Sequence, residues 1–167
     1  MNARHWWPAY VGIGSNLESP QQQVIRAFED LAQVRESRLI AKSGLYRSAP
    51  LGPTEQPDFV NAAAALLTRL SPGDLLEALQ AVEDARGRDR GMTGWGPRIL
   101  DLDLLVYGRV TSDSAELRLP HPRIAERNFV LLPLQEIAPY LQIPGLGSVA
   151  TLAAAVADAE PTITKLA

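Results

Sequence analysis

The chain has 167 residues, and its apolar content of 46% and charged content of 21% are ordinary for one globular domain. A net charge of −3 argues against a general nucleic-acid binder, and no apolar run approaches the roughly 20 residues that cross a bilayer. The absence of cysteine excludes disulfides and thiolate metal sites and is compatible with the cytoplasm, where we expect this protein. Residues 1–8 lack the apolar core of a signal peptide, so we expect an N-terminal extension followed by a single domain at 9–167.

The N-terminal part of the chain predicts a strand, a helix and a second strand. Residues 9–14 predict the first strand, and Ser19 followed by Pro20 predicts a helix N-cap with proline in the first helical position. Apolar residues at helical spacing extend this helix to about Val34, and looser alternation at 37–47 predicts the second strand. The Gly-x-Gly of the first strand lacks the third glycine of a dinucleotide-binding loop, so we reject that interpretation.

The segment 59–70 follows a loop rich in proline and glycine at 49–57, and its structure is ambiguous. Loops of this length are often functional, although prolines also stiffen plain connectors. The alanine run in the segment favours a helix on propensity. The alternative is a buried strand with Phe59, Asn61 and Ala63 on one face, and periodicity does not decide between the two.

A helix is predicted to begin at Ser71, because Ser71 and Asp74 form a variant of the capping box. Gly87 predicts the end of this helix, since glycine favours the position after a helix C-terminus. Gln80 and Glu83 lie on its polar face, where side chains are normally solvated.

The stretch 95–108 combines an apolar run with two aspartates. Apolar runs bounded by glycine and proline predict a buried strand, in which Asp101 and Asp103 share one face with Cα atoms about 6.6 Å apart. The opposite, core-facing side is expected to carry Leu100, Leu102, Leu104 and Val106. Two carboxylates beside a hydrophobic surface repel each other, which a Mg²⁺ ion would relieve; the alternative is a solvated pair on an edge strand.

Arginines cluster on both sides of this strand, and the planar guanidinium suits phosphate oxygens. The group before the aspartates comprises Arg86, Arg88, Arg90 and Arg98. The group after them comprises Arg118, Arg123 and Arg127. Because the loop at 87–94 combines three glycines with two arginines, we expect a mobile lid over an anionic substrate.

The C-terminal third predicts short strands and two helices. The predicted elements are strands at 109–111 and 117–119, a turn at 120–123, a helix that includes 129–137 and an alanine-rich helix at 149–157. Pro133 would disturb an uninterrupted helix. A lone histidine such as His121 is more often structural than catalytic, but beside arginines it can donate to a phosphate.

Paired carboxylates, a lid and further arginines describe the handling of a polyphosphate, in which catalysis comes mainly from positioning and charge neutralisation. No spacing indicates a Ser-His-acid set, and cysteine is absent, so we expect direct transfer between two bound substrates. A P-loop lysine motif is also absent, which argues against an ordinary P-loop kinase.

Five motifs follow one another along the chain, at 14–17, 46–52, 56–62, 95–103 and 119–122. The most specific is Gly-Pro-Arg-x-x-Asp-x-Asp, which ends at Asp103. In sequence and order these motifs resemble the 6-hydroxymethyl-7,8-dihydropterin pyrophosphokinase family of folate biosynthesis. The resemblance extends from Gly12 to about Pro144, which is nearly the whole chain.

The resemblance implies an α+β, ferredoxin-like fold, with an antiparallel sheet and flanking helices in a three-layer α/β/α arrangement. It therefore implies a strand at 59–70, with Phe59 and Asn61 on one face. It also implies a transferase in which ATP donates its β,γ-diphosphate to the hydroxymethyl group of the dihydropterin, and AMP leaves. The expected protein is a monomer that binds ATP, the pterin and two Mg²⁺ ions, without nucleic acid or membrane.

The resemblance also implies roles for individual residues. Asp101 and Asp103 would hold the Mg²⁺ ions, and Arg88 and Arg98 would stabilise the transferred diphosphate. The pterin, stacked between two phenylalanines, would be bound by Ser48, Ala49, Leu51, Phe59, Asn61, Trp95 and Phe129. ATP would be bound by Gln80, Glu83, Arg90, Trp95, Arg98, Leu104, Arg118, His121 and Arg127.

Some positions depart from the family pattern. Phe59 stands where many relatives carry tyrosine, which keeps the stacking and loses a hydroxyl. Arg118 is shifted by two residues from an arginine of some relatives. The adjacent Trp6 and Trp7 would pack on a neighbour or on the domain's own surface. Two alternatives stay open: a non-catalytic pterin- or nucleotide-binding module, and another phosphotransferase or sugar-nucleotide transferase with an Asp-x-Asp pair.

Overall fold

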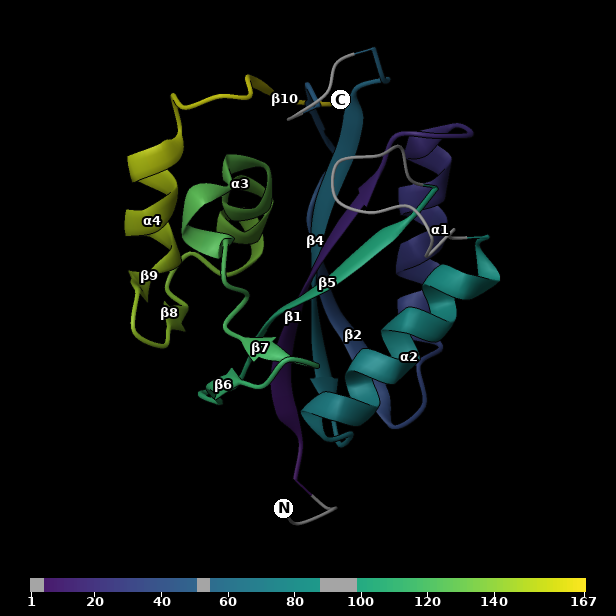
Figure 1. Ribbon diagram of the computed structural model, residues 1–167, viewed down its shortest axis with the longest axis vertical. Coiled ribbons are helices and arrows are strands. Elements are labelled where there is room, and N and C mark those ends of the chain that lie inside the picture. The colour runs from purple at the N-terminus through teal and green to yellow at the C-terminus, as the bar shows by residue number, and fades with distance from the viewer. Residues whose placement is uncertain (1–4, 51–54, 88–98) are drawn as a thin grey trace.

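An antiparallel sheet forms the centre of the computed structural model, which describes residues 5–50, 55–87 and 99–167 (Figure 1). Its strands are β1 (Trp7–Ser15), β2 (Ser37–Lys42), β3 (Tyr46–Ser48), β4 (Phe59–Thr68), β5 (Asp101–Tyr107) and β10 (Ile163–Lys165). They lie in the order β10-β3-β4-β1-β5. β2 pairs with the second half of β4, on the same edge of β4 as β3.

Helices lie on both faces of this sheet (Figure 1). One face carries α1 (Pro20–Ala32) and α2 (Pro72–Ala85), and the other carries α3 (Asn128–Ile137), with α4 (Val149–Val156) packed on α3. The shorter elements are β6 (Ser112–Asp113), β7 (Arg118–Leu119), the 3₁₀ helix η1 (Ile124–Glu126), β8 (Gln142–Ile143) and β9 (Gly147–Ser148). Each face therefore has its own hydrophobic cluster. Among the described residues, no helix has the length and apolar character needed to span a membrane.

The alanine-rich segment is a strand, as the family resemblance implied, and not a helix. β4 pairs with β1 from Val60 to Thr68 and with β2 and β3 on its other edge, so the sheet satisfies its backbone on both sides. Ala62, Ala63, Ala64 and Ala65 are all at most 4% exposed. Helix propensity is a weak preference that tertiary packing overrides, and here small side chains let helices approach both faces of the central strand.

A β-bulge interrupts the alternation of β5. Leu100, Leu102 and Leu104 face the α1/α2 cluster, as predicted. The pairing of β1 with β5 then shifts register between Tyr10 and Val11, which leaves Leu105 as an extra residue. Leu105 and Val106 consequently both lie in the α3/α4 cluster. The prediction that Val106 shares the face of Leu104 was therefore wrong.

Three further predictions of secondary structure are corrected. The strand expected at 37–47 is split into β2 and β3, because the Ser43 hydroxyl accepts the Ala63 N–H at 2.9 Å in place of a ladder carbonyl. The return strand expected at 109–111 lies at β6 instead, after a turn at Gly108 with φ +51°. α3 continues through Pro133, whose ring is buried.

The predicted helix starts are both present, with different capping. The Ser71 hydroxyl accepts the Asp74 N–H at 3.1 Å, and Gly87 follows α2 with φ +83°, as predicted. α1 begins at Pro20 as predicted, but Ser19 has φ 62° and its side chain makes no capping hydrogen bond. β1 begins at Trp7, and Trp6 packs on the protein's own surface between Arg38 and Arg69.

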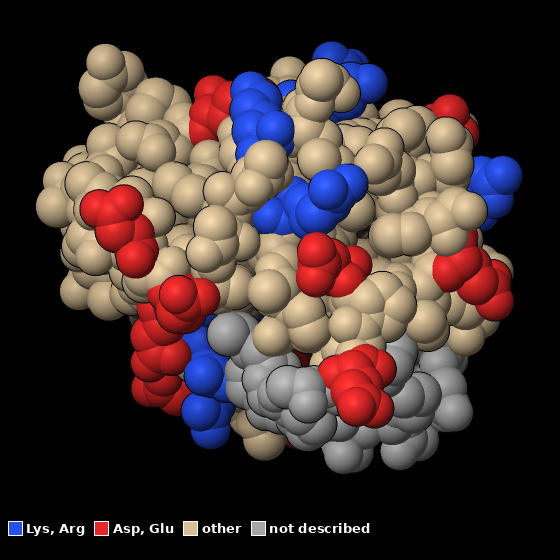
Figure 2. Space-filling model, turned by 90° about the horizontal axis from the view of Figure 1, so that it is seen from above, with Lys and Arg blue, Asp and Glu red and all other residues tan. Residues whose placement is uncertain are grey.

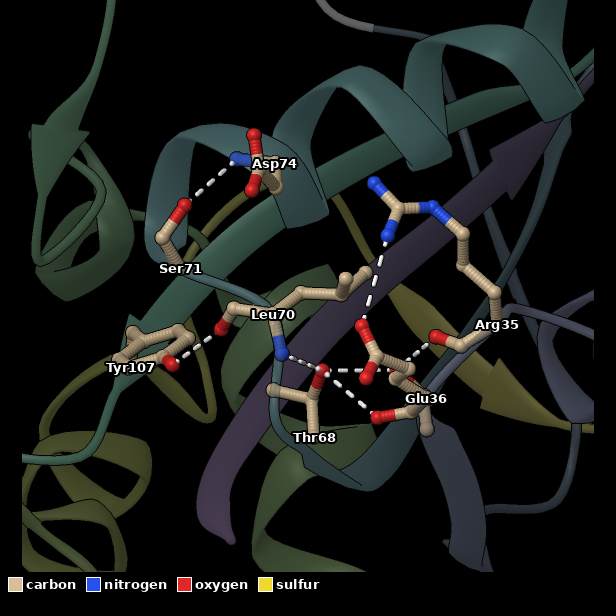
Figure 3. A network of polar contacts seen from close by, with 8 residues as sticks. Arg35, Glu36, Thr68, Leu70, Ser71, Asp74 and Tyr107 are labelled. Carbon is tan, nitrogen blue, oxygen red and sulfur yellow. Dashed lines mark hydrogen bonds and ion pairs between the residues drawn. The ribbon is translucent and has the colours of Figure 1, made fainter. Parts of the chain in front are cut away.

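A polar network joins the ends of three elements at one end of the sheet (Figure 3). The Tyr107 hydroxyl at the end of β5 donates to the Leu70 carbonyl, and the Leu70 N–H donates to the Thr68 hydroxyl at 3.0 Å. Ser71, which caps α2, follows directly. These bonds fix the turn from β4 into α2, at the opposite end of β1 from Ser15.

Candidate active site

A pocket of about 190 Å³ lies between the sheet and the start of α3. The structure brings eight of the predicted site residues together around it: Ser48, Ala49, Phe59, Asn61, Asp101, Asp103, Arg127 and Phe129. These eight residues combine two phenyl rings and a buried amide with two carboxylates and a guanidinium. Seen from above, basic and acidic side chains lie close together near the middle of this end of the molecule (Figure 2).

The floor of the pocket is a row of residues on three adjacent strands. Gly14 on β1 pairs with Asn61 on β4 and with Asp101 on β5, and Gly12 pairs with Asp103. A Cβ atom on Gly14 would lie 3.3 Å from Asn61 Oδ1, which is a tight contact. Glycine therefore keeps the floor open between the amide and the carboxylates. Gly12 and Gly14, which do not form a dinucleotide-binding loop, contribute to the pocket because they have no side chains.

The polar group at the aromatic end of the pocket is held in one orientation. Asn61 Nδ2 donates to Ser48 Oγ at 2.7 Å, and both residues are buried. Because a buried amide is costly without partners, this bond fixes Asn61 for recognition of a polar ring edge. Phe59 and Phe129 are partly buried and line the same cavity, where flat rings can stack on a planar heterocycle.

The two aspartates at the other end of the pocket suit a hard cation. Both are half-buried on the pocket side of β5, and Arg127 Nη1 lies 4.0 Å from Asp103 Oδ2. Mg²⁺ is commonly held by one or two carboxylates together with substrate phosphates and water. Within the part of the chain that the structure describes, no cluster of three or more His, Cys, Asp or Glu forms a complete metal cage. Two neighbouring carboxylates fit Mg²⁺ as a pair of oxygen ligands.

His121 lies beside this charged group in its neutral form. Burial is the main cause that lowers its pKa to about 4; the nearby Arg127 and Arg123 lower it further, while Asp101 acts in the opposite direction. Its Nδ1 accepts the Arg123 N–H at 3.2 Å, so the ring proton is assigned to Nε2. The His121 N–H in turn donates to the carbonyl of Leu105 at 2.8 Å, at the bulge of β5.

Glu83, on α2, supports β5, the strand that carries both aspartates. Its side chain is 4% exposed, and Oε2 accepts the backbone N–H of Leu102 at 2.8 Å, between the two aspartates. The solvated position expected for Glu83 on the polar face of α2 was therefore wrong, because the helix packs against the open edge of β5. Nothing in the sequence pattern of α2 distinguishes this glutamate from its exposed neighbours.

The residues that end β1 anchor two loops. The buried Asn16 donates to Gln56 Oε1 at 2.9 Å and to the Pro57 carbonyl at 3.1 Å. The Ser15 hydroxyl donates to the carbonyl of Ile99, just ahead of the aspartate strand. This explains the Gly-Ser-Asn motif physically, since it fixes the chain on either side of the pocket.

Several predicted site residues lie elsewhere or outside the described residues. Gln80 is exposed on α2, Glu83 is buried against β5, Leu104 faces the core and Arg118 is exposed on β7, and neither these four residues nor His121 line the pocket. Outside the described residues lie Leu51, Arg88, Arg90, Trp95 and Arg98, together with most of the predicted lid. Arg123, which the prediction named only as part of an arginine group, does line the pocket.

Comparison with known proteins agrees with this geometry. The model of the 7,8-dihydro-6-hydroxymethylpterin-pyrophosphokinase (HPPK) family matches residues 10–139. A Pseudomonas aeruginosa protein, 2-amino-4-hydroxy-6-hydroxymethyldihydropteridine pyrophosphokinase, is 50% identical over 135 residues, which cover 81% of this chain and 83% of that protein. The chain belongs to the HPPK family. A Haemophilus influenzae protein of the same name is 42% identical over 150 residues, covering 90% of this chain and 93% of that protein.

Solved structures support the HPPK-like fold. The crystal structure of wild-type Plasmodium falciparum HPPK-DHPS with pteroate matches with a TM-score of 0.71 at 14% sequence identity. The match covers 90% of this chain and 42% of that longer chain. At this identity the likeness concerns the fold, in which a mixed α and β chain builds an antiparallel sheet with helices.

We predict that Glu83→Ala lowers both stability and turnover. The substitution leaves the Leu102 N–H without its acceptor, which costs about 1–3 kcal/mol in the free energy of unfolding and loosens the strand that carries both aspartates. Glu83→Gln keeps an oxygen acceptor and should retain more of both properties. Denaturant unfolding and steady-state rates measure this, with the exposed Glu77→Ala on the same helix as the control. Equal effects of Glu83→Ala and Glu77→Ala would contradict the assigned role.

We predict that His121 stays neutral in the free protein until the pH approaches about 4. Since its pKa is lowered from 6.5 on folding, the unfolded chain binds this proton first, and His121 contributes a loss of stability as the pH falls from about 6.5 to about 4. NMR titration of the ring protons measures the pKa directly. His5 is the other histidine, and His121→Gln assigns the signals. A midpoint near 6.5 for His121 would refute the prediction.

Proposed function

We propose that this chain catalyses Mg²⁺-dependent transfer of the β,γ-diphosphate of ATP to the hydroxymethyl oxygen of 6-hydroxymethyl-7,8-dihydropterin, releasing AMP in folate biosynthesis. The observation that carries the proposal is one pocket that joins two aromatic rings and a fixed amide to two carboxylates, in a chain of the HPPK family. The relative from Pseudomonas aeruginosa bears the name of this pyrophosphokinase.

The aromatic end of the pocket would bind the pterin. Phe59 from β4 and Phe129 from α3 would stack on the two faces of the ring, and the amide of Asn61 would hydrogen-bond its polar edge. Ser48 holds that amide in place at 2.7 Å. A pterin in this position would direct its hydroxymethyl group toward the carboxylate end of the same cavity.

The charged end would bind the triphosphate. Asp101 and Asp103 would hold Mg²⁺, which when bound neutralises phosphate charge. Arg127 lines the pocket 4.0 Å from Asp103, and the neutral His121 has an Nε2–H available as a donor. In the proposed step, the hydroxymethyl oxygen attacks the β-phosphorus and gives up its proton to water, the bond from that phosphorus to the bridging α,β-oxygen breaks, and AMP leaves with that oxygen. The protein's residues position the two substrates and form no covalent intermediate.

We also propose a ferredoxin-like fold, further substrate contacts and a monomeric state. A ferredoxin-like arrangement is supported by the strand order β3/β2-β4-β1-β5 and by α1 and α2 on one face. The diphosphate contacts of Arg88 and Arg98, and the roles of Leu51, Arg90 and Trp95, stay part of the proposal. So do the ATP contacts of Gln80, Glu83, Leu104 and Arg118, and a monomer in the cytoplasm.

We predict AMP formation from ATP only when both Mg²⁺ and 6-hydroxymethyl-7,8-dihydropterin are present. Asp101→Asn and Asp103→Asn keep the side-chain shape but remove charge, and each should lower turnover by roughly a hundredfold or more by weakening transition-state stabilisation. Chromatography of the nucleotides measures AMP and ADP separately. Pterin binding without any product would favour the non-catalytic module, and activity with nucleotide sugars would favour the sugar-nucleotide alternative.

We also predict that Arg123 contributes to ATP binding. It lines the pocket, half-exposed, and its Nε lies 3.3 Å from Glu126 Oε2, which partly neutralises it. Arg123→Gln should raise the KM for ATP about tenfold, as expected for loss of a charge-assisted contact, with little change in the KM for pterin. Glu126→Gln should lower the KM for ATP or leave it unchanged. The exposed Arg26→Gln on α1 is the control, and an unchanged KM for ATP in Arg123→Gln would contradict this role.

A further inference from the structure

The last part of the chain connects the two walls of the candidate pterin pocket. After α4, residues 157–162 pass the start of α3, and the chain ends alongside β3 as β10 (Figure 1). We infer that this C-terminal strap, residues 157–166, sets the spacing between the Phe129 wall and the Ser48/Phe59 wall, with Asn128 as the positioning residue. The inference rests on the proposed function, because it assigns pterin affinity to these contacts.

Asn128 ties the strap to the α3 wall. It is the first residue of α3, is 1% exposed, and stands in sequence between Arg127 and Phe129, which both line the pocket. Its Nδ2 donates to the Ala159 carbonyl at 2.9 Å and to the Pro161 carbonyl at 2.8 Å. One amide group thus uses both of its N–H bonds to hold a segment more than 30 residues away.

β10 ties the strap to the other wall. Ile163 of β10 pairs with Ser48 of β3, and Ser48 pairs on its other side with Phe59 of β4. β3 has three residues, so pairing on both of its edges is what keeps so short a strand in register. The Leu166 N–H adds a bond to the Leu45 carbonyl at 2.8 Å, just before β3.

The carboxylate of Glu136, near the end of α3, contacts both the β3 region and the strap. Glu136 accepts the Tyr46 hydroxyl at 2.6 Å and the Gly44 N–H at 2.9 Å, and it lies 3.0 Å from Lys165 Nζ of the strap. The strap is therefore attached to α3 near both helix ends and to β3 along its length. Movement of α3 relative to β3 would break several of these bonds together.

The strap itself stays outside the pocket, since none of its residues is among those that line the cavity. Its effect on a bound ring must act through the position of the two walls. Stacking depends on the separation of the two aromatic faces, whereas the aspartates on β5 are held from other elements, by β1 and by Glu83. Arg127, which we propose binds ATP, adjoins Asn128, but the aspartates do not depend on the strap, so loosening the strap should weaken pterin binding more than ATP binding.

The test is Asn128→Ala in the full chain, with the KM for pterin and for ATP measured separately. We expect the KM for pterin to rise about tenfold, the KM for ATP to rise by a clearly smaller factor and kcat to fall little, because stacking is lost mainly in binding. Lys165→Met, at a half-exposed position that should not affect folding, is expected to give a smaller rise in the same direction. Tyr107→Phe is the control, because it removes one buried hydrogen bond at the far end of the sheet.

Several results would overturn the inference. An unchanged KM for pterin in both Asn128→Ala and Lys165→Met would do so. Equal rises in the KM for pterin and the KM for ATP would also do so. So would a rise in the KM for pterin of the same size in Tyr107→Phe. Calorimetry of pterin binding to the same proteins tests the inference without turnover. A wild-type protein that binds pterin but forms no AMP would contradict the proposed function alone.

Discussion

The pairing register of β4, β1 and β5 is the constraint on which the candidate site depends. It places Asn61, Gly14 and Asp101 in one row across three strands. Side chains on a strand alternate between faces, so a slip of one residue would move the amide or the carboxylates to the α1/α2 side. Gly14 has no side chain, which leaves the space between the two functional groups open. One row of the sheet thereby links an aromatic subsite to a charged one.

Contacts from β1, from α2 and from the turn after β7 hold β5, the strand that carries both aspartates. On one edge it pairs with β1, while Glu83 from α2 accepts the N–H of Leu102. The bulge at Leu105 places that carbonyl where it accepts the N–H of His121, which brings the turn after β7 beside the aspartates. A local irregularity in one strand therefore positions a histidine, and with it the arginines of the following segment. The two aspartates are held by backbone contacts that are independent of any ligand.

Much of the site followed from residue types and spacing, and the remainder depended on packing. The alternation of Asp101 and Asp103 predicted a shared face, and the family resemblance implied the roles of Phe59, Asn61 and Phe129. The exposed position expected for Glu83 was wrong, because only the packing of α2 on β5 buries it. The bulge that moves Val106 to the other face leaves no trace in the hydrophobic pattern, since every residue around it is apolar. Arg123 stood in a recognised arginine group, but its place in the pocket depends on the turn that follows β7.

The sequence by itself determined the helix starts, the paired carboxylates and, through its ordered motifs, the family. These features are local, because they depend on caps, spacing and short runs of residue types. Tertiary structure decided that the alanine run is the central strand, since pairing on both edges outweighs a weak helix preference. It also decided that Asn128 and the C-terminal strap join two walls of the pocket. Contacts across more than 30 residues carry no local signature, so only the folded chain brings them together.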